Sequence, residues 1–190
     1  MKTINYPKNI DVLINSCCLL IYCSTTKRIV LFEREIGTEN IALIAGGREI
    51  NEDPADTALL EATEEAGVKL TRDQLITVIT VGGEKLPLYE LQLNPETNKY
   101  TAYFYVVTEN EFPLATHAII DPSTNKPEGR AFWGDPILLL GENCIYRKGN
   151  ADTLIFFAKE SGYDILSTNL ELSNKIKALK MVWSKTPYHI

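Results

Sequence analysis

A helix with two clearly marked ends is the feature that most limits the folds open to this chain. Asp53 is a good N-cap residue, and Pro54 suits the first helical position, where its missing N–H costs nothing. Gly67 suits the position just past the last turn, because glycine readily adopts the left-handed conformation that ends many helices. The sequence therefore predicts one helix between Asp53 and Gly67.

One side of this predicted helix is apolar and made of small residues. Ala55, Leu59, Ala62 and Ala66 recur at helical spacing. Because three of the four are alanines, we expect the helix to pack closely against a sheet.

The other notable feature of the helix is a group of glutamates near its end. Glu61, Glu64 and Glu65 have i, i+3 and i, i+4 spacing, so they share one face and repel one another. They also lie at the negative end of the helix dipole, which adds to the cost. A hard divalent cation accounts for the arrangement, because such ions are held by carboxylate oxygens. The alternative is a solvated acidic face with no ligand.

With its flanks, this segment resembles the signature of the Nudix hydrolases. The signature runs Gly, five residues, Glu, seven residues, Arg-Glu, an apolar residue, any residue, Glu-Glu, any residue, Gly and an apolar residue. The positions that agree are Gly46, Glu52, Glu61, Glu64, Glu65, Gly67 and Val68. The resemblance proper covers residues 46–68, and the strand order extends it loosely toward residue 160.

The segment departs from the family pattern in two places. Leu60 stands where the family has an arginine that helps to orient the carboxylates, and Arg48 in the preceding loop could supply a substitute charge. The glycine pair also lies one residue closer to Glu52 than is usual, and Ala45 stands where a proline is common.

The resemblance implies roles for particular residues. Glu61, Glu64 and Glu65 would hold Mg²⁺ or Mn²⁺ and carry the catalysis, and Glu52 would support them. The backbone at Gly46 and Gly47 could approach a phosphate, since glycine has no Cβ, and Arg34 and Arg48 are further candidates for binding substrate. Many family members use a later-loop carboxylate as base or ligand; Glu128 is the choice here, with Glu109 and Glu111 as rivals.

The remaining pattern predicts an α/β (α+β) protein with a mixed sheet between helices, as in the Nudix fold. β-branched and aromatic runs predict strands at residues 12–23, 28–33, 75–81, 86–93 and 100–107. Residues 108–130 read as a long polar connection, followed by a short strand at 131–133. Helices are expected at residues 152–160, with Asn150 as a cap, and at 172–183.

Composition limits the remaining possibilities. The 190 residues suffice for a single domain, residues 1–190. A net charge of −6 argues against a nucleic-acid polymer as partner. The apolar run at residues 12–22 is too short to span a membrane. Four cysteines without metal-binding spacing read as core thiols in a reducing compartment, so a cytoplasmic protein is expected.

The function expected from these observations is metal-dependent hydrolysis of the pyrophosphate linkage in a nucleoside diphosphate joined to another group. Two alternatives remain open: a catalytically weak or inactive Nudix-fold module that binds or senses a nucleotide, and an unrelated protein with an acidic helix. Leu60 favours the binding module, and the three retained glutamates favour the hydrolase. The particular substrate and the oligomeric state stay open, with a homodimer as one possibility.

Overall fold

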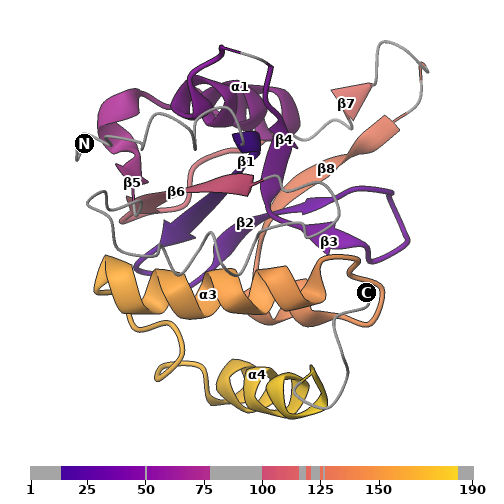
Figure 1. Cartoon of the computed structure of the whole chain (residues 1–190), viewed down its shortest axis with the longest axis vertical. Helices are drawn as coiled ribbons and strands as arrows, with labels where there is room; N and C mark the ends of the chain where they lie inside the picture. Colours follow the sequence, from indigo (N-terminus) through magenta and orange to yellow (C-terminus); the bar gives the residue numbers. More distant parts are fainter. Residues whose placement is uncertain are drawn as a thin grey trace.

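The computed structural model describes residues 14–49, 51–77, 100–115, 119–120, 125 and 127–183. It contains a mixed sheet with the strand order β5-β6-β1-β2-β8-β7, in which β3 joins β2 and β4 joins β1 (Figure 1). The strands are β1 (Ile14–Cys23), β2 (Ile29–Glu33), β3 (Ile41–Ala42), β4 (Ile44–Gly47), β5 (Ile76–Thr77), β6 (Tyr100–Thr108), β7 (Ile119–Ile120) and β8 (Pro127–Gly134). The helices are α1 (Pro54–Ala66), η2 (Arg72–Gln74), η3 (Pro136–Leu140), α3 (Arg147–Ser161) and α4 (Leu170–Trp183).

Strand β1 lies at the centre of the sheet and is apolar on both sides. Its side chains alternate between two cores, with Cys17 and Leu19 in one and Cys18 and Leu20 in the other. It runs parallel to β6 and antiparallel to β2 and β4. A strand buried on both faces needs a continuous apolar run, which explains the composition of this segment.

Helices cover both faces of the sheet, as the sequence predicts. Helix α1 lies on one face, and α3 lies on the other with α4 beyond it (Figure 1). The small residues Ala55, Ala58, Ala62 and Ala66 of α1 are buried in the first core. Leu172 and Ile176 of α4 are buried in the second core with residues of α3. The expected mixed sheet between helices is therefore confirmed.

Strands β1 and β2, both predicted from the sequence, form a hairpin but stay paired only near their turn. Tyr22 of β1 pairs with Ile29 of β2, whereas residues 16–19 of β1 pair with residues 44–47 of β4. The far end of β2 pairs instead with β3, through Glu33 and Ile41. The sheet thus divides between β1 and β2, and the short β3–β4 segment crosses from one part to the other.

Two predicted boundaries were wrong. Strand β8 begins at Pro127, inside the segment that was expected to be loop, because residues 130–134 pair with β2 and residues 127–129 pair with β7. Helix α3 begins at Arg147 instead of residue 152. Asn150 is therefore inside the helix, where its buried amide donates a hydrogen bond to the carbonyl of Leu139 at 3.0 Å. Partners distant in sequence decide both boundaries.

Several predictions fall on residues outside the described part of the chain. They include the strand at 86–93, the end of the strand at 75–81 and residues 12–13 of the first strand. Among the described helices, none combines the length and apolar character that crossing a membrane would require. All four cysteines are buried free thiols, as the sequence predicts.

Candidate active site

Both ends of α1 are fixed as the sequence predicts. The Asp53 carboxylate accepts a hydrogen bond from the Ala55 N–H at 2.8 Å, which caps the first turn. Gly67 adopts φ 68°, and the N–H groups of Gly67 and Val68 bond back to the carbonyls of Thr63 and Ala62 at 3.0 Å. This ending fixes the orientation of the last turn, which carries the glutamates.

Glu65 connects this last turn to strand β4. Its side chain is buried, with 9% of the residue exposed, and its Oε2 accepts a hydrogen bond from the Ala45 N–H at 3.0 Å. A carboxylate is rarely buried unless donors satisfy it. The position of Glu65 is therefore set by both α1 and β4.

Glu61 lies one helical turn earlier, directly over the backbone of Gly46. A Cβ atom added at Gly46 would overlap the Glu61 carboxylate, whereas a Cβ at Gly47 would meet nothing within 4 Å. Gly46 is therefore needed because its missing side chain leaves room for a carboxylate. The signature glycine and the signature glutamate, fifteen positions apart in the printed sequence, meet here.

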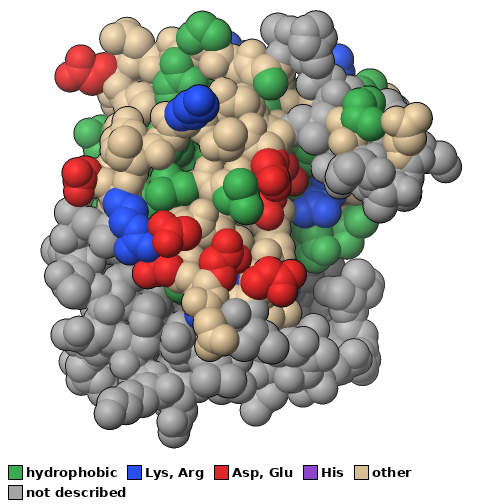
Figure 2. All heavy atoms as spheres, turned by 90° about the horizontal axis from the view of Figure 1, so that it is seen from above, with side chains coloured by type: hydrophobic (Ala, Val, Ile, Leu, Met, Phe, Trp, Pro, Cys, Tyr) green, Lys and Arg blue, Asp and Glu red, His purple; other side chains and the backbone are tan. Residues whose placement is uncertain are grey.

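Glu64 and Glu52 complete what we call the glutamate strip, which is Glu52, Glu61, Glu64 and Glu65. Glu64 is exposed to solvent. Glu52 accepts hydrogen bonds from the Thr57 hydroxyl at 2.8 Å and from the Glu49 N–H at 3.3 Å. Acidic side chains gather on the face of the molecule that carries α1 (Figure 2). Within the described residues, no three acidic, cysteine or histidine side chains already form a metal-ligand cluster.

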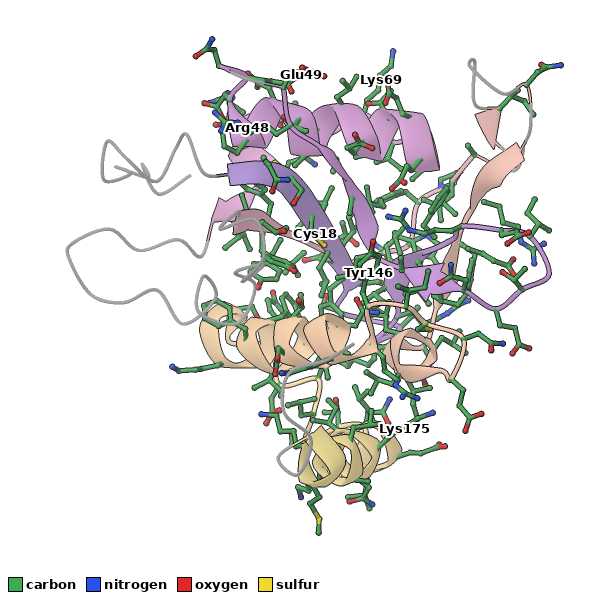
Figure 3. All side chains as sticks on the ribbon, turned by 45° about the vertical axis from the view of Figure 1, so that its right-hand side comes forward. Cys18, Arg48, Glu49, Lys69, Tyr146 and Lys175 are labelled. Carbon is green, nitrogen blue, oxygen red and sulfur yellow. The ribbon has the colours of Figure 1, made fainter. Side chains whose placement is uncertain are left out.

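Arg48 lies at the start of the strip, where it stabilises the loop before α1. Its Nε donates a hydrogen bond to the Glu52 carbonyl at 2.6 Å, and its N–H bonds to the Asn15 carbonyl at 2.8 Å. Figure 3 shows Arg48 and Glu49 together on this loop. Leu60, which replaces the family arginine, is 48% exposed on α1.

The pKa of the Cys17 thiol in β1 depends on charged residues of the strip and its surroundings. Burial raises the pKa of Cys17 to about 12; the Thr57 hydrogen bond and Arg48 act to lower it, while Glu52 and Glu61 act to raise it. These four residues therefore surround one buried position of the central strand. The sequence contained no sign of this link between Cys17 and the strip, because Thr57 reads as an ordinary helix residue.

Arg34 directly follows β2 in the chain. Its guanidinium carbon is 5.7 Å from the centre of the Tyr146 ring. Tyr146 was not among the predicted site residues. Its partner Arg34 is distant in the chain, and the helix that follows Tyr146 was predicted to start too late.

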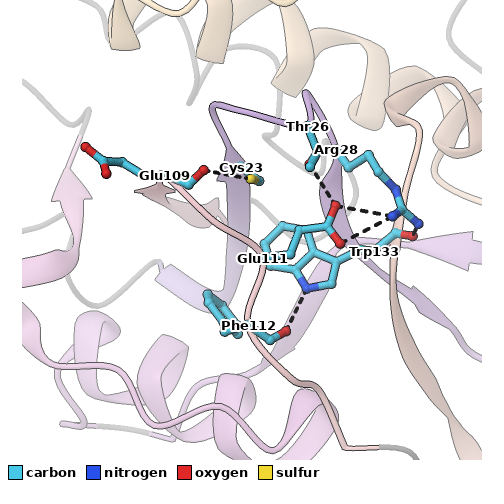
Figure 4. A network of polar contacts seen from close by, with 7 residues as sticks. All are labelled: Cys23, Thr26, Arg28, Glu109, Glu111, Phe112 and Trp133. Atoms are coloured by element: carbon cyan, nitrogen blue, oxygen red, sulfur yellow. Dashed lines mark hydrogen bonds and ion pairs between the residues drawn. The ribbon is translucent and has the colours of Figure 1, made fainter.

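The later carboxylates have different surroundings. The backbone of Glu128 lies in β8, while its side chain falls outside the described part of the structure. The Glu111 carboxylate accepts a hydrogen bond from the Thr26 hydroxyl at 2.7 Å and pairs with Arg28 at 3.2 Å (Figure 4). Arg28 also contacts the Trp133 carbonyl. Glu111 thus links the segment after β6 to the turn between β1 and β2. Glu109 is exposed.

The side chains of the strip offer the type of donor that a hard divalent cation takes. Their donors are carboxylate oxygens, which Mg²⁺ and Mn²⁺ prefer over softer ligands. Glu61 and Glu65 approach β4 from successive turns of one helix, so their carboxylates lie along the same helix–strand boundary.

Solved structures of similar shape were found by comparison. A MutT/nudix family protein from Enterococcus faecalis is 16% identical with a TM-score of 0.44, and the match covers 70% of this chain and 46% of that one. The NUDIX domain of Shewanella oneidensis NrtR, solved with ADP ribose, is 11% identical with a TM-score of 0.47, covering 79% and 94%. The chain resembles Nudix proteins in structure.

A third solved structure also has a similar shape. The E. coli dihydroneopterin triphosphate pyrophosphohydrolase is 17% identical with a TM-score of 0.48, and the match covers 75% of this chain and 98% of that one. The chain spans just under half the length of the Enterococcus protein. No protein-family model matches the sequence, and no curated protein matches it.

Proposed function

We propose that this protein is a metal-dependent hydrolase that cleaves the pyrophosphate linkage of a nucleoside diphosphate joined to another group. One observation carries the proposal: Glu61 lies over Gly46 and Glu65 binds the Ala45 N–H, so two glutamates of α1 are held against the glycine-containing strand β4. Gly47, the next residue of this strand, has open space where a Cβ would lie, so a phosphate could approach its backbone closely.

The chemistry of the linkage explains why carboxylates would be gathered here. A diphosphate carries negative oxygens that repel a nucleophile, and the protein has a net charge of −6. Bound Mg²⁺ or Mn²⁺ would neutralise those oxygens and make a coordinated water more acidic. The glutamates would hold and orient the ions, with Glu52 fixed by Thr57 as support. Positioning and electrostatic stabilisation supply most of what phosphoryl transfer requires.

The proposal can be tested with a panel of nucleoside diphosphate derivatives in the presence of Mg²⁺ or Mn²⁺. The products are a monophosphate and its partner, so phosphate is released only after a phosphatase is added. We expect Glu64→Gln and Glu65→Gln each to lower the rate by at least about a hundredfold, because losing a ligand removes several kcal/mol of transition-state stabilisation.

Glu171→Gln is the matched control. Glu171 is an exposed glutamate in the first turn of α4, on the opposite side of the sheet from α1. This variant should retain wild-type activity. Full activity in Glu64→Gln or Glu65→Gln would show that the ligand assignment is wrong, provided that circular dichroism shows each variant to be folded.

A second candidate function is a Nudix-type module that binds a nucleotide with little or no cleavage. Leu60 favours it, since this exposed leucine stands where the resemblance calls for an arginine that orients the carboxylates. Replacing it by arginine separates the candidates. An enzyme should keep or gain activity in Leu60→Arg, whereas a pure binding module should show no turnover in either form. A complete loss of activity in Leu60→Arg would show that leucine is adapted to a different arrangement of the carboxylates.

The buried free cysteines support, as part of the same proposal, a protein of a reducing compartment such as the cytoplasm. Its substrate would be a small molecule.

A further inference from the structure

The hydroxyl of Thr57 is directed away from the backbone of its own helix. A threonine inside a helix often donates to the carbonyl four residues earlier. Thr153 of α3 does so, with its hydroxyl 2.8 Å from the Gly149 carbonyl. In α1 the corresponding distance, from Thr57 to the Asp53 carbonyl, is 3.5 Å, and the hydroxyl lies instead 2.8 Å from Glu52 Oε2. A hydroxyl has a single proton, so this proton goes to the carboxylate.

The hydrogen bond between Thr57 and Glu52 is shielded from water on the threonine side. Thr57 is 1% exposed, and the Cys17 thiol is its neighbour in the core. A buried hydroxyl that loses its partner is costly. A hydrogen bond to a carboxylate is also roughly twice as strong as one between neutral groups. The bond is therefore well suited to hold the Glu52 side chain in one position.

Both hydrogen bonds that the Glu52 carboxylate accepts from described residues end on the same oxygen. Oε2 accepts from the Thr57 hydroxyl and, at 3.3 Å, from the Glu49 N–H. The Glu52 carbonyl accepts from Arg48 Nε at 2.6 Å, which fixes the backbone of the same residue. Within the described part of the chain no donor meets Oε1, so this oxygen is left for a ligand.

Thr57 brings Glu52 next to the glutamates of α1. Thr57 and Glu61 have i, i+4 spacing, so they share one face of the helix, with Cβ atoms about 5–6 Å apart. That face meets the sheet, because the Glu61 carboxylate lies over Gly46, which pairs with Cys17 across β4 and β1. Glu52 and Glu61 both raise the pKa of the Cys17 thiol, so both charges lie around this pair of strands. A glutamate from the loop is thus held beside a glutamate of the helix.

We propose that Thr57 is a positioning residue of the metal site: its buried hydroxyl holds the Glu52 carboxylate at Oε2, so that this glutamate joins Glu61 as a ligand of the divalent cation. Glu52 is the ligand, and Thr57 acts only through it. Without the hydroxyl, the Glu52 side chain would occupy several rotamers, and ordering it would weaken the binding of the ion. The identity of the ion rests on the proposed function, whereas the positioning can be tested without a substrate.

The test is the affinity of the full-length protein for Mn²⁺, followed by electron paramagnetic resonance without nucleotide. Thr57→Val keeps the shape of the side chain and removes the hydroxyl. It should raise the dissociation constant about tenfold or more, the range expected when the hydrogen-bonding partner of a metal ligand is lost. Thr57→Ser, which keeps a hydroxyl, should bind nearly as wild type does. Thr57→Ala also lacks the hydroxyl and suits a helix, so it provides a second measurement of the same loss.

Thr153→Val is the matched control. Thr153 is also a 1% exposed helical threonine, but its hydroxyl donates to the Gly149 carbonyl of its own helix on the other face of the sheet. This variant should leave the affinity for Mn²⁺ unchanged.

A double variant separates positioning from a purely structural role. Because Thr57 acts through Glu52, Thr57→Val combined with Glu52→Gln should bind Mn²⁺ no more weakly than Glu52→Gln alone. Additive losses would overturn the proposal, and so would absence of Mn²⁺ binding by wild type. Wild-type affinity in a folded Thr57→Val or Thr57→Ala variant, or a loss in Thr57→Ser as large as that in Thr57→Val, would overturn it as well.

Hydrolysis assays separate this inference from the proposed function. Mn²⁺ binding that depends on Thr57, without turnover of any diphosphate, would uphold the positioning role and reject the enzyme. Turnover by wild type, together with an unchanged affinity for Mn²⁺ in Thr57→Val, would uphold the enzyme and reject the positioning role.

Discussion

At the scale of single residues, Gly46 and Glu61 depend on each other although they belong to different elements. The glutamate carboxylate occupies the space in which a Cβ of residue 46 would lie. The end of a glutamate side chain can move at little energetic cost, so an added methyl group would displace the carboxylate and leave the fold intact. We therefore expect a substitution of this glycine to change the position of Glu61 more than it changes the stability of the fold.

We predict that Gly46→Ala lowers the affinity for Mn²⁺ and the hydrolysis rate by about tenfold or more, because a ligand moved by about an ångström loses its geometry. Manganese binding followed by electron paramagnetic resonance is the measurement. Gly47→Ala is the control, since a Cβ there meets nothing within 4 Å. Equal behaviour of the two variants would contradict the placement of Glu61.

At the scale of elements, the end of α1 is held by a strap that we define as residues 109–115. The Ala115 N–H donates to the Ala66 carbonyl at 2.8 Å, and the Phe112 carbonyl accepts a hydrogen bond from the Trp133 indole at 2.9 Å. The Glu111–Arg28 pair fixes the other end of the strap (Figure 4). The strap thus connects the glutamate-bearing turn to β2 and β8.

We predict that Gly67→Ala destabilises the protein more than Gly162→Ala does. Both glycines end helices with positive φ, 68° and 76°, so alanine costs roughly 1–2 kcal/mol of backbone strain at either position. At Gly67 the new Cβ would also lie 2.8 Å from the Ala115 Cβ, whereas Gly162 has open space. The additional loss should be about 1 kcal/mol or more, measured by urea denaturation. Equal losses would mean that the strap moves away freely.

The sequence predicted the elements whose signals are local. Helix α1 was placed correctly because Asp53, Pro54 and Gly67 act within one or two turns of their positions. The glycine of the signature was found, but the contact of Gly46 with Glu61 depends on how α1 crosses β4. The start of α3 was missed because Tyr146 offers no side-chain cap, and the pairing of Arg34 with Tyr146 has no local signal at all.

At the scale of the whole molecule, two buried carboxylates affect stability in opposite directions. Burial alone would raise the pKa of Glu33, but hydrogen bonds from the Gly37 N–H and from Arg130, at 3.0 and 2.8 Å, lower it below its usual 4.5. Burial raises the pKa of Asp152 above its usual 3.8, although Lys180 and Lys148 act against the shift. Glu33 thus favours the folded state at neutral pH, and Asp152 opposes it.

The pH dependence of unfolding should separate the two. The stabilisation from Glu33 is present above pH 4.5 and is lost as the pH falls through the lower pKa of the folded state. Glu33→Gln should therefore destabilise the protein at pH 7 and weaken the dependence of its stability on acid pH.

The contribution of Asp152 to stability is complete below pH 3.8 and is lost as the pH rises through the higher pKa of the folded state. Asp152→Asn should therefore raise the Tm at pH 7. Thermal melts from pH 3 to 8 are the measurement. A lower Tm in Asp152→Asn would show that the carboxylate has a stabilising partner.

The alternation of β1 gives the molecule two built-in spectroscopic probes. Cys17 and Cys18 are neighbours in sequence but point into opposite cores, one near Arg48 and Glu61 and the other near Arg34 and Glu65. Burial keeps both thiols protonated at neutral pH, so each retains an S–H bond whose infrared stretching frequency follows the local electric field. Changes in the electric field on the two faces of the sheet can then be recorded separately, in a single unlabelled sample.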